Sequence, residues 1–304
     1  MKALLVYFSG TGNTTRIAEL YKSEFIKAGV DVDKIELPTD GLPDISGYDY
    51  IGIGYPIHGF NAPKPILALC KKFPMRNKKT DGVKNAFVFK TSGEPVRMSD
   101  VSSLKMRKIL KRRGYNVISE YQYVMPYNII FRHTDHEVYK MWTTAQALVP
   151  ADVAEIMQGK TRLPKRMFMG GFLAWILRCE HWGAHILGKM FKANKDCVKC
   201  GMCEKLCPVH NIRITKKGKV KFGGKCLICM RCVQNCPKAA ISMGLLNGWK
   251  VNGAYSFAPP DDDKPQKTKH DKYCKKAYDR YYLNAQERID TYNAKQTEKN
   301  NVEL

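Results

Sequence analysis

Eight of the eleven cysteines in this chain lie within forty residues and repeat one spacing twice. Both runs have the form C-x2-C-x2-C-x3-C and are followed directly by proline. The first run is Cys197, Cys200, Cys203 and Cys207, and the second is Cys226, Cys229, Cys232 and Cys236. Thiolates at this spacing ligate a cubane iron–sulfur cluster, so the sequence predicts two [4Fe–4S] clusters.

Structural zinc and disulfide bonds are the competing uses of closely spaced cysteines. Zinc needs four ligands, which two C-x2-C pairs supply, whereas each run here has three cysteines at three-residue spacing and a fourth before proline. Disulfides need an oxidising compartment, and Met1-Lys2 leads into a strand-like segment without a signal-peptide pattern. We therefore expect a reducing cytoplasm and an anaerobic source. Of the scattered cysteines, Cys70 is expected to be a buried small side chain, and Cys179 and Cys274 are given no role.

The doubled run resembles the bacterial two-cluster ferredoxins. In that family the fourth cysteine of each run ligates the cluster of the other run. The resemblance implies one cluster on Cys197, Cys200, Cys203 and Cys236, and a second on Cys226, Cys229, Cys232 and Cys207.

Strand and helix patterns alternate through the first 160 residues. Apolar strand-like runs are expected at 3–8, 50–54, 86–89 and 117–124, and helices at 65–73, 101–113 and 135–157. Such alternation predicts an α/β fold with a parallel sheet that helices cover on both faces.

The turn after the first apolar run, Ser9–Thr14, contains two glycines interleaved with hydroxyl side chains. It opens into a helix, whose first N–H groups and dipole favour an anion. The turn has no lysine, and both the P-loop and the G-x-G-x-x-G patterns are absent from it. An ordinary strand–helix turn would have a similar composition, and it stays the alternative.

This turn resembles the [ST]-x-T-G-x-T phosphate loop of the flavodoxins. The resemblance implies a flavodoxin-like doubly wound five-stranded parallel sheet of order 2-1-3-4-5, with bound FMN. It also implies a set of phosphate-binding residues, namely Ser9, Thr11, Gly12, Asn13, Thr14 and Thr15.

Two later loops correspond by position to the flavodoxin loops that close over the isoalloxazine ring. The first supplies Pro56, His58, Gly59 and Phe60, and the second supplies Thr91, Ser92 and Gly93. Gly59 is expected to face flavin N5, since glycine changes its backbone conformation readily. His58 or Phe60 would stack on the ring, although His58 is equally expected as a solvated loop residue. Many flavodoxins carry a stacking tyrosine in the later loop, and none lies between Thr91 and Val96.

The positive charge of the chain is concentrated around the cysteine runs. Residues 160–245 contain 18 basic and 3 acidic residues, a net charge of +15 out of +23 for the whole chain. Positive charge favours the reduced cluster and attracts acidic surfaces, so we expect redox partner proteins with an acidic docking surface.

An apolar stripe precedes the first cysteine run, within residues 165–192. Its uncharged core, Met167–Leu177, has eleven residues, fewer than the roughly 20 that span a bilayer. The stripe at helical spacing consists of Phe168, Phe172, Trp175, Ile176, Cys179, Trp182 and Ile186, with basic residues at both ends. We expect this helix to pack against a neighbouring domain. Contact with an anionic membrane is the alternative.

Taken together, residues 1–245 resemble the fused flavodoxin–ferredoxin proteins of anaerobic bacteria and archaea. The expected units are a flavodoxin-like FMN-binding domain at 1–160, a basic amphipathic linker helix at 161–194, a small α+β ferredoxin domain at 195–245, and a peripheral extension at 246–304. The extension is expected to contain a short helix at 273–282 and a frayed end.

The resemblance implies electron transfer between FMN and two [4Fe–4S] clusters, with no catalytic acid, base or nucleophile. The alternative is an FMN-dependent reductase of a small acceptor such as a quinone or porphyrin. A binding protein with purely structural clusters is a third class. No groove-reading or base-stacking motif is visible, so no nucleic-acid partner is expected. The expected localisation is cytoplasmic, with membrane association through residues 165–192 left open.

Overall fold

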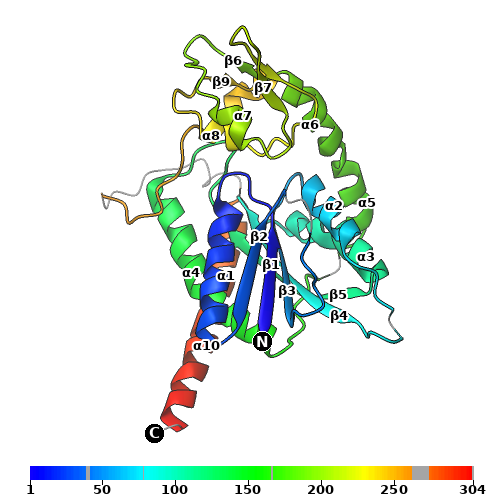
Figure 1. Cartoon of the computed structure of the whole chain (residues 1–304). Coiled ribbons are helices and arrows are strands. Elements are labelled where there is room, and N and C mark those ends of the chain that lie inside the picture. Colours follow the sequence, from blue (N-terminus) through cyan, green and yellow to red (C-terminus); the bar gives the residue numbers. More distant parts are fainter. Residues whose placement is uncertain (39–41, 78, 166, 262–273, 303–304) are drawn as a thin grey trace.

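The first half of the chain forms five strands interleaved with helices (Figure 1). The structure is a computed structural model that describes residues 1–38, 42–77, 79–165, 167–261 and 274–302. The strands are β1 (Lys2–Tyr7), β2 (Asp31–Glu36), β3 (Tyr50–Pro56), β4 (Lys84–Ser92) and β5 (Tyr115–Val124). They pair in parallel in the order β2-β1-β3-β4-β5, which confirms the predicted doubly wound sheet.

Side chains of the central strands alternate between two hydrophobic cores. In β1, Leu4 and Val6 belong to one core, whereas Leu5 and Tyr7 belong to the other. This period of two follows from the pleat, and burial on both faces explains the continuous apolar run in the sequence.

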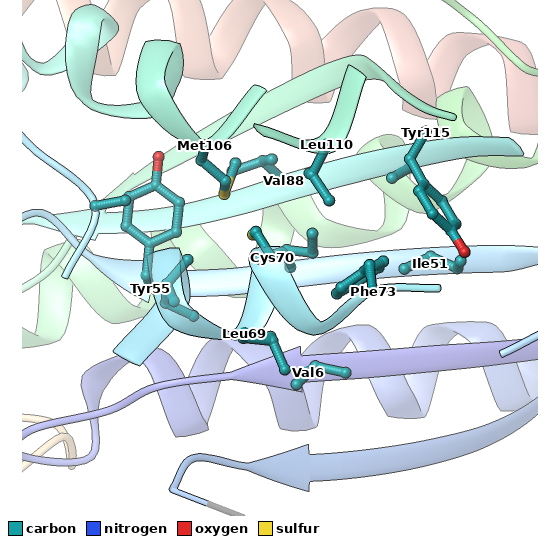
Figure 2. Close-up of a cluster of buried hydrophobic side chains, with 14 of the residues drawn as sticks. Val6, Ile51, Tyr55, Leu69, Cys70, Phe73, Val88, Met106, Leu110 and Tyr115 are labelled. Carbon is teal, nitrogen blue, oxygen red and sulfur yellow. The ribbon is translucent and has the colours of Figure 1, made fainter. Parts of the chain in front are cut away.

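One core lies under α2 (Lys64–Lys72) and α3 (Leu104–Arg112), which cover the same face of the sheet (Figure 2). Cys70 is fully buried there, as the sequence predicted, beside Phe73 and Leu110. A 3-10 helix at Arg97–Ser103 leads into α3, so the helix expected at 101–113 begins a turn later than predicted.

The opposite face is covered by α1 (Asn13–Lys27) and α4 (Asp135–Met157). The bounds of α4 are those that the sequence predicted. Its start is fixed by a capping box, in which the Thr134 hydroxyl accepts a hydrogen bond from the backbone N–H of Glu137 at 3.3 Å. The Glu137 carboxylate in turn accepts one from the N–H of Thr134 at 2.9 Å.

Strand β2 is at the edge of the sheet, where its side chains are half-buried or exposed. Its sequence, DVDKIE, has charged residues at four of its six positions and no apolar run. Only β1 pairs with it, so the sequence carries a weaker strand signal than in the central strands.

The cysteine runs form a smaller lobe beyond the carboxyl ends of the sheet strands (Figure 1). Its elements are β6 (Lys192–Ala193), α7 (Met202–Leu206), β7 (Ile212–Ile214), β8 (Val220–Phe222), α8 (Arg231–Gln234), β9 (Ile241–Ser242) and a 3-10 helix at Gly244–Trp249. The strands form two antiparallel pairs, β6 with β9 and β7 with β8. This is the small α+β unit that the sequence predicted.

Two helices, α5 (Gly170–Leu177) and α6 (Cys179–Lys189), connect the sheet to this lobe along one side of the molecule (Figure 1). The sequence predicted that the apolar stripe on this segment packs against a neighbouring domain, and this prediction is wrong. Gly170, Ala174 and Ala184 face inward and are buried, while the large stripe residues Phe172, Trp175, Trp182 and Ile186 are exposed. No helix in the described part of the chain is long and apolar enough to cross a bilayer.

The C-terminal segment forms α10 (Lys275–Val302), far longer than the short helix expected at 273–282. The start of that expected helix, residue 273, lies outside the described residues. Helix α10 packs against α4, where Arg288 forms ion pairs with the carboxylates of Asp152 and Glu155. Ala285 joins the core under α1 and α4. The first half of α10 is therefore part of the sheet domain rather than a peripheral extension.

Candidate functional site

Four cysteines from two different runs line one cavity at the outer end of the small lobe. They are Cys197, Cys200, Cys203 and Cys236, and Ile214, Val220 and Ile241 complete an apolar wall around them. A second cavity is lined by the other four cysteines, Cys207, Cys226, Cys229 and Cys232. Each cavity thus combines three cysteines of one run with the fourth of the other, which is the grouping that the ferredoxin resemblance implied.

The backbone of the two runs turns at equivalent positions. Lys199 and Ile228, each just before the second cysteine of its run, both have left-handed φ values, of 56° and 49°. Gly201 and Met230, just after that cysteine, also have positive φ values. The sulfur of the last cysteine in each run accepts a backbone hydrogen bond at 3.2 Å, from Asn211 to Cys207 and from Ala240 to Cys236. N–H donors of this kind stabilise thiolate charge and tune a bound cluster.

The cysteine side chains are grouped four to a cavity, as ligation of two iron–sulfur clusters requires. All eleven cysteines are described, and none is in a disulfide. Within the described residues, no group of three or more His, Cys, Asp or Glu side chains gathers to hold a single metal ion. Burial raises the pKa of the Cys229 thiol to about 11 and also raises the pKa of Cys232 and Cys226. Burial thus disfavours the charged thiolate at these positions, and a metal bound to the sulfurs would offset that cost.

The turn after β1 is held in a fixed conformation by its own side chains. Gly12 precedes α1 with a φ of 92°, a value that favours glycine. The Ser9 hydroxyl accepts hydrogen bonds from the N–H groups of Gly12 at 3.1 Å and Thr15 at 3.4 Å. The Asn13 amide donates to the carbonyl of Pro126 at 2.8 Å, and Thr14 Oγ1 lies 2.9 Å from Thr91 Oγ1.

A cavity of about 340 Å³ opens next to this turn, at the carboxyl ends of β1, β3 and β4. Its volume is in the range of small-molecule and cofactor sites, and its position is the switch point at which such sheets bind ligands. Most of the predicted flavin-site residues line it, namely Ser9, Thr11, Asn13, Thr14, Pro56, His58, Gly59, Phe60, Thr91, Ser92 and Gly93. Gly12 and Thr15 are not among the lining residues, and both contribute to the turn through Ser9.

The segment His58–Asn61 folds into a tight turn at the mouth of this cavity. His58 and Asn61 exchange backbone hydrogen bonds at 3.0 and 2.8 Å. Between them Gly59 and Phe60 both have positive φ values, of 48° and 56°. The His58 ring meets Phe8 edge to face at 6.2 Å between centroids, so it is half-buried rather than a solvated loop side chain.

The loop after β5 supplies a wall of the cavity that the sequence reasoning missed. Met125, Pro126, Tyr127 and Asn128 all line it. The Tyr127 ring lies so close to Gly93 that a methyl group on Gly93 would overlap it. Its hydroxyl donates to the Glu94 carboxylate at 2.7 Å, and its ring stacks on that of His133 at 5.3 Å. The sequence did offer one signal for this loop, namely its position directly after the strand β5. Ligands bind at the carboxyl ends of the strands in such sheets.

The small lobe closes another side of the same cavity. Leu187, Ile228, Leu246 and Trp249 come from α6 and the cysteine-bearing lobe, and all four line it. Ile228 lies between Cys226 and Cys229, so the second cysteine cavity is directly adjacent to this wall.

The lobe and the turn after β1 also contact each other directly. A methyl group on Gly10 would overlap the backbone carbonyl of Cys229. Arg231, two residues further on, donates to the carbonyls of Gly10, at 3.2 Å, and Ser9. Its guanidinium also forms an ion pair with Glu36 at the end of β2, at 2.6 Å. A single side chain thus connects the second cysteine run to the turn.

Residues 192–241 match the family model of the 4Fe-4S dicluster domain. An uncharacterised protein of Methanocaldococcus jannaschii is 43% identical over 51 residues, which are 17% of this chain and 20% of that protein. The match therefore spans about a fifth of the relative's length.

Among solved structures, a flavodoxin from the domain Archaea is 20% identical, covering 52% of this chain and 99% of its own, with a TM-score of 0.36. The Megasphaera elsdenii flavodoxin is 22% identical, with coverage of 40% and 85% and a TM-score of 0.33. The FMN-bound flavodoxin of Fusobacterium nucleatum is 12% identical, with coverage of 53% and 99% and a TM-score of 0.37. On its own strand order and the matched domain, the chain joins a sheet of flavodoxin-like topology to a 4Fe-4S dicluster domain.

Proposed function

We propose that this chain carries electrons between FMN, bound in the cavity beside the turn after β1, and two [4Fe–4S] clusters in the cysteine-lined cavities. The observation that carries the proposal is the direct contact between the second cysteine run and that turn, made by Arg231, Gly10 and Cys229. Two redox groups in one chain need such proximity to exchange electrons without a diffusing intermediary.

The turn has the donors that an FMN phosphate requires. The start of α1 presents backbone N–H groups, and Thr11, Asn13 and Thr14 add polar side chains at the cavity wall. Ser9 preorganises the turn by accepting the N–H groups of Gly12 and Thr15. The isoalloxazine would lie between the His58–Asn61 turn and Tyr127, which lines the cavity and would supply the stacking tyrosine that the later loop does not have.

The two cysteine cavities have different neighbours, which suggests an order of transfer. The cavity of Cys226, Cys229, Cys232 and Cys207 adjoins the flavin cavity through Ile228. The cavity of Cys197, Cys200, Cys203 and Cys236 is nearer the surface, where Cys200 and Val198 are exposed. FMN takes up one or two electrons, whereas a [4Fe–4S] cluster takes up one. FMN and the clusters together would therefore link two-electron to one-electron chemistry.

A partner would meet the outer cluster, in the most basic part of the chain. Lys199 and Lys238 both line the outer cavity. The net charge of +15 over residues 160–245 favours a partner with an acidic docking surface.

A substrate-specific FMN-dependent reductase is the competing function. It requires a small acceptor, such as a quinone, to reach the flavin. Leu187, Ile228, Leu246 and Trp249 form one wall of the cavity and would cover one side of a bound flavin, which favours the carrier. Steady-state reduction of such an acceptor without a partner protein would favour the reductase instead.

Anaerobic purification followed by cofactor analysis and redox titration tests the proposal. About one FMN and about eight iron atoms per chain are expected from two cubanes and one flavin site. Optical and EPR spectra during the titration should show both cluster and flavin transitions. Folded protein with zinc in place of iron, or clusters that cannot be reduced, would contradict it.

A further inference from the structure

The outer surface of α5 and α6 carries a concentration of exposed large apolar side chains. These are Phe172, Trp175, Ile176, Trp182 and Ile186, together with Phe168 and Met169 just before α5, here called the aromatic face. Phe168 is 91% exposed, Trp182 79% and Trp175 63%. The rings of Phe172 and Trp175 stack on each other at 6.1 Å instead of packing into a core. Contiguous exposed apolar surface of this kind marks an interaction site.

The two helices bury small residues and expose large apolar ones, which is the opposite of an ordinary amphipathic helix. Their inward residues are small, with Gly170 and Ala174 buried in α5 and Ala184 and Gly188 buried in α6. Gly188 approaches the second cysteine run so closely that a methyl group there would overlap Cys226. The fold therefore needs the small side of these helices, and it leaves the large aromatic side in water, where it contributes nothing to the core.

Basic residues surround the aromatic face. Lys165 precedes it, Arg178 lies between the two helices, and Lys189 and Lys192 follow it. Between 165 and 192 the sequence has a single acidic residue, Glu180, against five basic ones. A stripe of tryptophan and phenylalanine flanked by lysine and arginine is the composition of helices that lie in the headgroup region of a bilayer.

We propose that the aromatic face docks the protein on the surface of an anionic lipid bilayer. Neither α5 nor α6 is long and apolar enough to cross the membrane, so both would lie in the interfacial plane with their indole rings among the headgroups. A second copy of the chain is a poorer occupant, because it would bring two strongly basic regions together. This inference is independent of the proposed electron transfer.

Docking through this face would place the redox sites next to the lipid. Leu187, on the inward side of α6, lines the flavin cavity, and Gly188 contacts the second cysteine run. Only the thickness of α6 would then separate the bilayer surface from the flavin cavity.

Co-sedimentation of the anaerobically purified full-length protein with lipid vesicles tests the proposal. The protein should bind vesicles that contain phosphatidylglycerol, bind vesicles of phosphatidylcholine alone much more weakly, and lose affinity as salt is raised. The double variant Trp175→Gln, Trp182→Gln should bind anionic vesicles about tenfold or more weakly, because two indole rings no longer enter the interface.

Two further double variants separate the contribution of the tryptophan side chains to vesicle binding from those of apolar exposure in general and of positive charge. Leu245→Gln with Leu283→Gln removes equally exposed apolar side chains elsewhere on the surface and should leave binding unchanged. Lys165→Glu with Lys192→Glu keeps the aromatic face and should reduce binding to anionic vesicles. Iron content and circular dichroism verify that every variant is folded.

Absence of binding by the wild type, or equal binding by wild type and the tryptophan variant, would overturn the proposal. Concentration-dependent dimerisation that the tryptophan variant abolishes would also overturn it, in favour of a second copy. Retention of an acidic protein but not of vesicles would overturn it in favour of a protein partner.

Discussion

Arg231 is the residue through which the cysteine-bearing lobe is attached to the turn after β1. Its guanidinium contacts two backbone carbonyls and the Glu36 carboxylate, and its side chain is 19% exposed. Hydrogen bonds to a charged group contribute more than neutral ones when they are partly shielded from water.

Replacing Arg231 with methionine is therefore expected to loosen this contact by about 2 kcal/mol. Hydrogen exchange at the amides of residues 9–15 should become faster, while iron content stays the same. Arg213→Met is the matched control, since Arg213 is exposed on β7 of the same lobe. Unchanged exchange in the Arg231 variant would mean that the residue does not hold the two parts together.

Cys207 is expected to serve the cluster of the other run. The Cys207→Ser variant should lose the spectroscopic signal of the cluster held by Cys226, Cys229 and Cys232, because those residues share its cavity. Cys236→Ser should instead affect the cluster held by Cys197, Cys200 and Cys203. EPR of the reduced variants distinguishes the two outcomes, and loss of the same signal in both variants would refute the crossed assignment.

Among single residues, the sequence predicted the candidate site residues that belong to a short local motif. The cysteine spacing and the Ser9–Thr14 turn are local, and both lead to cavities in the structure. Arg231 was missed because its contact with Gly10 joins segments 221 residues apart, whereas the position of Tyr127 directly after β5 was a signal that the sequence did offer. No local spacing encodes such a contact.

Helix α6 approaches the second cysteine run closely at Gly188. A Gly188→Ala substitution would place a methyl group against Cys226 and force the helix outward, at a cost of about 1–3 kcal/mol. We expect a lower midpoint of thermal unfolding and loss of iron from the adjacent cavity.

Gly183→Ala in the same helix is the control, since nothing lies within 4 Å of the position of its added methyl group. It should be neutral or stabilising by up to about 1 kcal/mol, because alanine favours helix more than glycine does. Equal effects of the two substitutions would show that helix propensity, not contact with Cys226, sets the outcome.

Helix α10 is attached to α4 through a buried carboxylate. Asp152 is buried, accepts a hydrogen bond from the Tyr123 hydroxyl and pairs with Arg288. The Arg288→Met variant leaves that carboxylate without its counter-charge and should lower the free energy of unfolding by about 3 kcal/mol. Adding Asp152→Asn should recover most of the loss. Anaerobic thermal unfolding of the single and double variants measures both effects.

The Asp152 carboxyl should also make the free energy of unfolding depend on pH. Burial raises the pKa of the Asp152 carboxyl from 3.8 to about 6, although Arg288 opposes the shift. The folded state then binds the extra proton between these two values, so the contribution of Asp152 to the free energy of unfolding falls as pH rises through that window. Arg288→Met should consequently be more damaging above pH 6 than below it. A pH-independent loss would argue against Asp152 as the cause.

Element prediction succeeded where burial on both faces produced apolar runs, as in β1, β3 and α4. It failed for β2, a charged edge strand, and for α10, whose sequence is rich in Lys, Asn, Gln and Glu. The stability of α10 comes from a few tyrosine contacts and the Arg288 ion pairs with α4, which are tertiary and leave little periodicity in the sequence.

In the whole molecule, the two halves are joined by direct contacts between the cysteine-bearing lobe and the turn after β1. The lobe lies on the carboxyl ends of the sheet strands (Figure 1). The cavity proposed for FMN lies beside the turn after β1 and shares Ile228 with the second cysteine cavity. The sequence predicted both halves and their charge, but a docking geometry depends on long-range contacts that no sequence period reports.

In the proposed function, electrons pass between FMN and the clusters within one chain. Anaerobic flash photoreduction of the FMN in the holoprotein tests it most directly, with cluster reduction followed optically. We expect a first-order transfer whose rate constant does not change with protein concentration, and which is slower in the Arg231→Met variant. A rate proportional to protein concentration, or no transfer from flavin to clusters, would contradict it.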